Sequence, residues 1–263
     1  MIIVVPVSKT DADVGVGFIK SFNHFGPYPN HKLLVVSRPD DVDYAEEILL
    51  SITDKNQFQD IDFHVFGDDG PRGWPRGCNH YWAETAKYLD DVIKSEEPWL
   101  WLEMDMVPLK QGWADDMYSE YKEHGKPFLG NFGNTTTVTS EQEVLVLCKH
   151  LVGAAIYPPN LDKYSKLWRK VQVLGVAWDV LCQWEFIPNA HETSLMQHVY
   201  RTCKYTKTQD DSTGRINIKG EMGEGFEKLK FPEPYDKRID LENVVLVHGC
   251  TDSSLADIVC DGI

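Results

Sequence analysis

The alternation of apolar runs with helix-like stretches over the first hundred residues is the feature that most limits the possible folds. Four short apolar runs have the character of strands: 2–7, 31–37, 61–66 and 99–102. Three stretches between them have the spacing of amphipathic helices: 11–25, 44–52 and 79–95. Because strands that alternate with helices at this distance form parallel sheets covered by helices, we predict an α/β fold with a mostly parallel central sheet flanked by helices.

The second half of the chain is less regular. We predict three helices there, at 113–124, 162–174 and 192–202, and two strands, at 151–157 and 241–248. The remaining segments read as a polar loop at 134–137, a long loop at 206–240 and a short tail at 249–263. With no internal repeat and no linker composition, we expect one domain over 1–263.

Net charge restricts the partners. The chain has 41 acidic and 26 basic residues, a net charge of −15 and a pI near 5.0. This balance excludes a protein that binds nucleic acid through overall positive charge. Residues 1–160 hold 25 acids and 13 bases, whereas 161–207 hold 4 acids and 7 bases. The stretch 161–207 is therefore either a solvated face or a surface for an anionic partner.

The cysteines and the apolar runs bear on location. None of the six cysteines forms a C-x-x-C pair, which fits neither a zinc site nor a small disulfide framework. No apolar run approaches the roughly 18 residues of a membrane span. The first residues also lack the basic region and long apolar stretch of a signal peptide. We expect free thiols and a cytoplasmic location.

Two acidic residues follow the apolar strand 99–102. Glu103 and Asp105 are two positions apart, and side chains at this spacing point the same way in an extended chain. Both carboxylates could therefore converge on one cation. Magnesium and manganese favour oxygen ligands and keep positions open for phosphate oxygens. The alternative is a solvated strand end with two unrelated acids.

His248 is a further candidate ligand near the other end of the chain. It ends the apolar strand 241–248 and is followed by Gly249. Imidazole suits manganese better than magnesium. A lone histidine is more often structural, so this prediction depends on whether His248 meets Asp105 in space.

The segment 70–79 is rich in glycine and proline and directly precedes a predicted helix. Glycine-rich turns and helix N-termini present backbone N–H groups to anions, and Arg72 and Arg76 add positive charge. The segment is either an anion-binding turn or a loop shaped only by its glycines and prolines.

Taken in order, these pieces resemble a known family. A first strand at 2–7, a Gly-x-Asn helix start at 77–79, acid-x-Asp-x-x-Pro at 103–108 and Val-His at 247–248 are similar to nucleotide-sugar-dependent glycosyltransferases of the GT-A type. Three segments, Gly-Trp-Pro-x-Gly-x-Asn, Trp-Leu-Trp-Leu-Glu-x-Asp and Gly-Ala-Ala-Ile-Tyr-Pro, resemble in particular compact glycosyltransferases encoded by bacteriophages.

The resemblance implies a single GT-A-like (Rossmann-like) domain, with a nucleotide-sugar and metal-binding half at 1–110 and an acceptor-binding half at 111–263. It implies a divalent metal, manganese or magnesium, bound by Asp105 and His248. Glu103 would lie beside the ribose or the metal, since this chain has Glu-Met-Asp where the family has Asp-x-Asp.

The resemblance also implies contacts to the donor, a nucleotide-sugar that is UDP-linked. Pro6, Val7 and Ser8 would flank the base, and either Asp68 or Asp69 would contact the base or ribose together with Asn79. Gly153 and Ala154 would lie beside the sugar. Tight packing explains small residues at 153–154 equally well. Apart from the resemblance, a net charge of −15 would repel a nucleotide-sugar, so we expect Arg72 and Arg76 to compensate for it locally.

Asp179 is the candidate catalytic residue. It precedes an apolar stretch that contains Trp184 and Phe186, and a carboxyl beside aromatic residues can have its pKa raised toward that of a general base. In inverting members of the family an acid near this point deprotonates the acceptor. Glu185 is the substitute candidate, and the alternative role for Asp179 is a helix cap.

We therefore expect an enzyme, a hexosyl- or pentosyltransferase that moves a sugar to an acceptor hydroxyl. The resemblance implies one specific acceptor, a 5-hydroxymethylpyrimidine in phage DNA in the host cytoplasm. The DNA phosphates would then meet the basic stretch 161–207 and four further residues, Arg215, Lys219, Lys228 and Lys230. The alternatives are a glycan or small-molecule acceptor, a non-catalytic nucleotide- or metal-binding protein, and a phosphoryl-transfer enzyme, although the chain lacks a G-x-x-x-x-G-K-[ST] loop.

Overall fold

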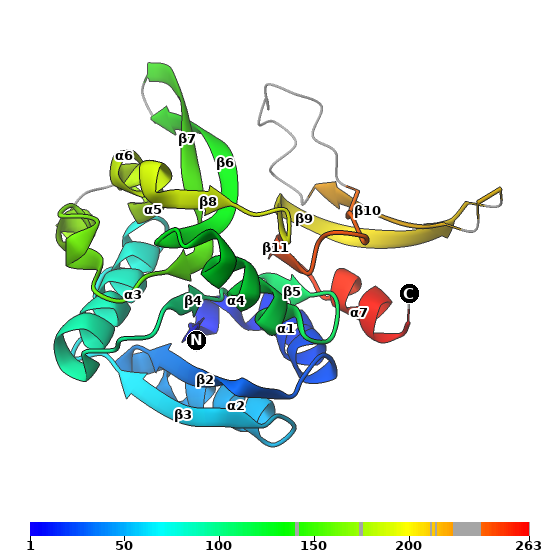
Figure 1. Ribbon diagram of the computed structural model, residues 1–263, viewed down its shortest axis with the longest axis horizontal. Helices are drawn as coiled ribbons and strands as arrows, with labels where there is room; N and C mark the ends of the chain where they lie inside the picture. Colours follow the sequence, from blue (N-terminus) through cyan, green and yellow to red (C-terminus); the bar gives the residue numbers. More distant parts are fainter. Residues whose placement is uncertain (140–141, 174–175, 211, 214, 223–237, 263) are drawn as a thin grey trace.

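A seven-stranded sheet forms the centre of the computed structural model, which describes residues 1–262 except 140–141, 174–175, 211, 214 and 223–237 (Figure 1). The strand order is β3-β2-β1-β4-β7-β6-β8. The bounds are Ile2–Val7 (β1), Tyr28–Ser37 (β2), Phe58–Val65 (β3), Trp99–Trp101 (β4), Phe128–Thr139 (β6), Gln142–Tyr157 (β7) and Ala190–Glu192 (β8). Strands β1 to β4 are mutually parallel, β7 is antiparallel to β4 and β6, and β8 is parallel to β6. The predicted α/β fold with a mostly parallel sheet is confirmed.

The first strand shows why this sheet is covered on both faces. Ile3, Val5 and Val7 pack in one core cluster together with apolar residues of α1 (Ala12–His24) and α2 (Val42–Thr53). Ile2 and Val4 pack in a second cluster with Trp82 of α3 (Arg76–Lys87). Because successive strand residues point to opposite faces, an unbroken apolar run fills two cores at once.

The remaining helical elements are shorter, apart from α4. Their bounds are Trp113–His124 (α4), Trp178–Leu181 (α5), Gln183–Phe186 (α6), Ser254–Cys260 (α7), Lys9–Asp11 (η1), Pro39–Asp41 (η2), Tyr88–Ile93 (η3), Leu161–Lys163 (η4), Trp168–Val173 (η5) and Ile187–Asn189 (η6). Helix α4 has glycines in the left-handed region at both ends, Gly112 and Gly125, and packs Trp113 and Met117 into the first core cluster. In the part of the chain described, no helix combines the length and the hydropathy that crossing a membrane requires.

A second sheet has the strand order β10-β9-β11-β5. Its strands are Met106–Pro108 (β5), Met196–Gln209 (β9), Ile216–Met222 (β10) and Leu246–Cys250 (β11). Strand β11 is antiparallel to β5 and parallel to β9. Strands β9 and β10 extend away from the central sheet (Figure 1). The chain passes from one sheet to the other between β4 and β5, at residues 102–105.

Several sequence predictions in the second half are wrong. Residues 134–137 are part of strand β6, and most of the predicted helix 192–202 is strand β9. The predicted loop 206–240 includes the end of β9 and all of β10, while its residues 223–237 lie outside the described residues. The predicted helix 162–174 is a pair of short 3-10 turns. Pairing with β7 decides residues 134–137, and pairing among β9, β10 and β11 decides residues 196–209 and 216–222. Strand formation depends on neighbouring strands more than on local preference.

Candidate functional site

The junction between the two sheets places the predicted acids. The Leu102 N–H still donates to the Val4 carbonyl at 2.9 Å, so the central sheet continues one residue beyond β4. The Met106 N–H then donates to the Glu103 carbonyl at 3.1 Å, which turns the chain into β5. Glu103 and Asp105 therefore lie at the carboxyl end of a parallel strand, the edge where open α/β sheets bind their ligands.

Strand β11 carries His248 to the same place. The N–H groups of Gly249 and Cys250 both donate to the Asp105 carbonyl, at 3.2 and 2.9 Å. The register of β11 with β9 shifts here, and Gly249 has a φ of 96°, a conformation that favours glycine. This local bulge explains the Gly that follows the histidine, since it holds His248 against the acidic turn.

The three side chains form one cluster. The His248 Nε2 is 3.0 Å from Glu103 Oε2 and 3.4 Å from Asp105 Oδ1, and one ligand atom from each residue lies within 4.8 Å of the others. The Trp101 indole N–H donates to Glu103 Oε1 at 2.9 Å, which orients that carboxylate. Two carboxylates and an imidazole are a donor set that accepts manganese or magnesium, so these residues could hold such a cation.

The electrostatics of the cluster favour positive charge. Burial lowers the pKa of His248, but the carboxylates of Asp105 and Glu103 outweigh it and raise the pKa to about 9. The His248 side chain is only 8% exposed, so an imidazolium is held away from water between two anions. A divalent cation satisfies the same two anions with more charge, in exchange for the imidazolium proton.

His198 is a member of this site that sequence reasoning missed. It lies directly beside His248 in the register of β9 with β11, and the two Nδ1 atoms are 3.0 Å apart. Burial and the neighbouring His248 lower the pKa of His198 well below its usual value. Neutral His198 therefore accepts the Nδ1–H of His248, which leaves the His248 Nε2 directed at the carboxylates. The wrong helix prediction at 192–202 hid this residue.

Asp179 lies in the first turn of α5 with its side chain 15% exposed. Its Oδ2 is 3.7 Å from the Nε2 of His150, on β7, and its Oδ1 accepts the Val180 N–H at 2.8 Å. The N-cap position belongs to Ala177, so Asp179 bonds a first-turn N–H without being the N-cap itself. Burial raises the pKa of Asp179, His150 lowers it, and the charge of Glu103 raises it further. Asp179 and the acidic turn thus share one electrostatic environment.

Glu185, the substitute for Asp179, has a structural role instead. Its carboxylate accepts the N–H groups of Lys166 and Leu167 at 3.1 and 3.4 Å. These bonds fasten the loop that follows η4.

Several predicted donor contacts lie along the carboxyl edge of the parallel strands. Pro6 and the fully buried Val7 end β1, and Ser8 follows them. The exposed Asp69 follows β3, and the exposed Arg76 opens α3. Parallel strands end at the same edge, so these residues line the edge that also carries Glu103. The Ser8 hydroxyl accepts the Thr10 N–H at 3.4 Å, and the Val7 carbonyl accepts the Tyr81 hydroxyl at 2.7 Å.

A buried arginine that sequence reasoning missed holds the turn before α3 by hydrogen bonds. Arg38, at the end of β2, is 3% exposed and donates to the carbonyls of Pro71 and Gly77 at 2.6 and 3.3 Å. Arg72 forms an ion pair with Asp40. Asp69 accepts the backbone N–H of Asp40 at 3.2 Å.

Three other predicted donor contacts are packed inside. Asn79 is fully buried, donates to the carbonyls of Val171 and Val176 at 2.8 Å and accepts the Trp178 N–H at 2.9 Å. A Cβ on Gly153 would come within 2.6 Å of the Trp178 ring, and Ala154 is 0% exposed. The structure favours the packing alternative for residues 153–154, and a contact of all three with a donor stays a prediction.

Comparisons with known proteins give only distant likenesses. No protein-family model matches the chain, and no curated protein matches it in sequence. One similar structure is 4-diphosphocytidyl-2C-methyl-D-erythritol synthase of Anaerococcus prevotii, at 9% identity, a TM-score of 0.46, and coverage of 73% of this chain and 86% of that chain. A second is the glycosyltransferase GlyE of Streptococcus pneumoniae, at 10% identity and a TM-score of 0.44, with coverage of 73% of this chain and 45% of that chain. A third is mouse xyloside xylosyltransferase 1, at 9% identity and a TM-score of 0.44, with coverage of 76% of this chain and 86% of that chain. At identities near 10% and TM-scores below 0.5, these likenesses establish no shared function.

Proposed function

We propose that this chain is a metal-dependent glycosyltransferase that moves a sugar from a nucleotide-sugar donor to an acceptor hydroxyl. The observation that carries the proposal is the cluster of Glu103, Asp105 and His248 at the carboxyl edge of the parallel strands. Glu103 and His248 are 145 residues apart in sequence and 3.0 Å apart in space. His248 is expected to be a ligand only if it lies beside Asp105, and its Nε2 is 3.4 Å from Asp105 Oδ1.

The chemistry of such a transfer suits this cluster. A leaving nucleoside diphosphate gains negative charge, and a bound divalent cation would stabilise that charge as a Lewis acid. The protein's own part is orientation: Trp101 holds Glu103, and His198 holds His248. Arg76 lies on the same edge and would offset the negative charge of the donor, while Ser8 and Asp69 would bind its polar groups.

Asp179 is proposed as the general base. Its burial and its raised pKa suit a carboxylate that takes a proton from an acceptor hydroxyl, and His150 lies beside it at 3.7 Å. This role makes the reaction an inverting one. In this proposal the acceptor hydroxyl approaches Asp179 at the start of α5.

In this proposal residues 1–110 supply most donor contacts and residues 111–263 bind the acceptor. The metal cluster draws on both parts, since His248 belongs to the second. The donor is UDP-linked in this proposal, with manganese or magnesium as the metal.

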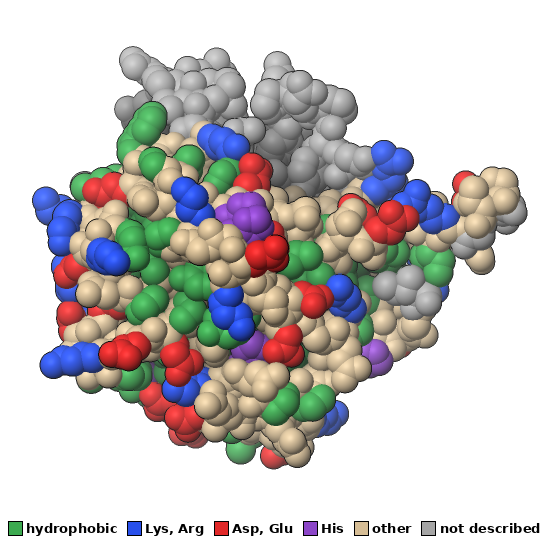
Figure 2. Space-filling model, viewed as in Figure 1, with side chains coloured by type: hydrophobic (Ala, Val, Ile, Leu, Met, Phe, Trp, Pro, Cys, Tyr) green, Lys and Arg blue, Asp and Glu red, His purple; other side chains and the backbone are tan. Residues whose placement is uncertain are grey.

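Two of the basic residues expected to meet DNA are paired with acids of the protein itself. Arg169 is engaged by Asp91 and Asp162, each at 2.9 Å, and Arg215 pairs with Glu242. Over the described part of the face in Figure 2, acidic and basic side chains are interspersed. Lys228 and Lys230 lie outside the described residues. The proposed acceptor is a 5-hydroxymethylpyrimidine in DNA, and the alternative is a glycan or small-molecule hydroxyl, which needs no basic face.

The test is a donor screen that measures nucleoside diphosphate release with manganese, magnesium or a chelator. Simple sugars and hydroxymethylated DNA serve as parallel acceptors. We expect release from one nucleotide-sugar, lost with the chelator and in Asp105→Ala, and retained in the exposed control Glu46→Ala. Equal release by Asp105→Ala and the wild type would remove the assigned site.

A further inference from the structure

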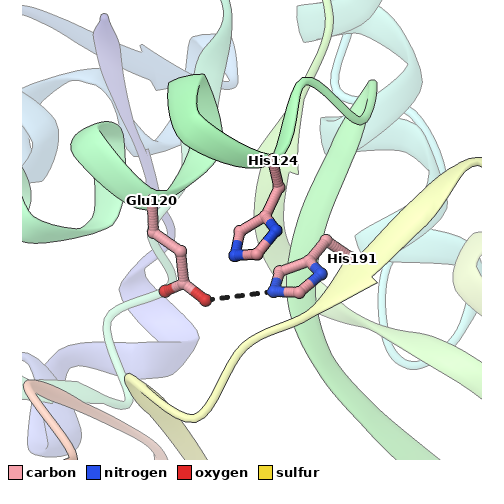
Figure 3. Close-up of side chains that lie close together, drawn as sticks. All are labelled: Glu120, His124 and His191. Carbon is pink, nitrogen blue, oxygen red and sulfur yellow. Dashed lines mark ion pairs between the residues drawn. The ribbon is translucent and has the colours of Figure 1, made fainter.

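A second group of side chains that could ligate a metal includes none of the residues named for the proposed transfer. Glu120 and His124 are one turn apart on α4, and His191 is the middle residue of β8, the edge strand of the central sheet. Figure 3 shows the three side chains pointing toward one another. One ligand atom from each lies within 4.8 Å of the others. Residues i and i+4 share a helix face, so α4 presents two ligands to the strand.

The distance between the carboxylate and one imidazole suits a small tetrahedral ion. Glu120 Oε1 and His191 Nε2 are 3.3 Å apart. Two ligands of a tetrahedral zinc, with bonds of about 2.0–2.1 Å, are separated by roughly 3.4 Å. The imidazoles of His124 and His191 stack with centroids 3.4 Å apart and an interplanar angle of 17°. A tetrahedral metal lies in the plane of each imidazole that it binds and sets the two ring centroids roughly 5 Å apart. Binding therefore requires the exposed His124 ring to turn out of this stack.

The carboxylate is also held in place. Glu120 Oε2 accepts the hydroxyl of Thr193 at 2.6 Å, and Thr193 is 2% exposed. Metal-binding carboxylates are commonly oriented by such a hydrogen bond from a neighbouring side chain. Glu120 is 17% exposed and His191 is 30% exposed, so the group is accessible to an ion from solution without being freely mobile.

We propose that Glu120, His124 and His191 form a second metal site, selective for zinc and similar transition-metal ions. Two imidazoles and one carboxylate favour these ions over magnesium. The site fastens α4 to the edge strand β8. Thr193, the residue after β8, also donates its N–H to the Gly130 carbonyl at 3.0 Å, and its hydroxyl accepts the Leu195 N–H at 2.9 Å. A metal at this site would therefore also hold the segment between β8 and β9.

The test measures binding of Zn²⁺, and of Co²⁺ as a spectroscopic probe, by the full chain. The Asp105→Ala variant removes the first cluster as a competitor. We expect Asp105→Ala to keep one zinc site that excess Mg²⁺ does not displace, with the visible absorption of Co²⁺ bound through imidazole. The melting temperature should rise by roughly 5 °C at a hundredfold excess of zinc over its Kd.

His124→Gln, placed in the Asp105→Ala background, should lose this site and its thermal shift. The residue is exposed and ends its helix, so the fold should survive. His24→Gln is the matched control, because His24 is also exposed and also ends a helix, α1. Zinc binding that vanishes with Asp105→Ala alone, or that is unchanged by His124→Gln, would overturn the proposal.

Discussion

The two clusters of ligating side chains differ in burial and in their balance of oxygen and nitrogen. The first, Glu103, Asp105 and His248, has two carboxylates and a histidine side chain that is 8% exposed. The second has one carboxylate and two imidazoles, with His191 30% exposed. Oxygen-rich sites suit magnesium and manganese, whereas imidazole suits zinc. Under the two proposals, the buried, oxygen-rich cluster would hold a reactive cation and the more exposed, imidazole-rich cluster a structural one.

We expect the largest difference between the two clusters in the turnover of variants that lack one ligand. Asp105→Ala removes a carboxylate ligand and should lower metal-dependent turnover about 1000-fold or more, since a Lewis acid contributes several kcal/mol of charge stabilisation. His124→Gln should leave turnover at saturating manganese within about twofold of the wild type. Steady-state kinetics with a manganese titration measure both. Comparable losses in the two variants would mean that the clusters do not differ in role.

Asp179→Asn should lower transfer about 100- to 10,000-fold, the range of a general base, and leave donor binding unchanged. It should also melt at a higher temperature than the wild type at neutral pH. Burial raises the pKa of Asp179, so its ionised form costs stability above the folded pKa, and this cost disappears as the pH falls below the unfolded pKa. The melting advantage should therefore shrink as the pH approaches 4. An advantage that grows at low pH would contradict the assignment.

His198→Ala should raise the manganese concentration required for half-maximal turnover about 10- to 100-fold, because it removes the acceptor that orients His248. Turnover at saturating manganese should change far less. His198→Gln keeps an acceptor and should restore part of the affinity. Zinc binding at the second cluster serves as the control, and a matching loss there would indicate general unfolding.

Gly249→Ala should have the smallest effect, a loss of about 1–2 kcal/mol in the free energy of unfolding. The φ of 96° is unfavourable for a residue with a Cβ. Because the bulge holds His248 to Asp105, manganese affinity should fall as well. Denaturant unfolding measures the first effect, and an unchanged midpoint would show that this backbone position is not constrained.

Local pattern predicted the first half of the fold. The apolar run at 2–7 and the strand before Glu103 are visible in the sequence, because a strand buried on both faces must be apolar at every position. The acid pair was equally visible, since two residues at a strand end share a direction by backbone geometry alone. Residues 196–209 gave no such indication, because their pairing with β11 decides their conformation.

The order of residues is sufficient to predict an α/β chain with a parallel sheet, an acidic turn after one strand and a histidine near the other end. Only the tertiary structure decided that His248 and His198 meet across β11 and β9, and that His191 faces α4. The physical reason is that strand and helix periodicity are properties of neighbouring residues. A metal site requires ligand atoms from distant segments within a few ångströms, and sheet register and helix packing set those distances.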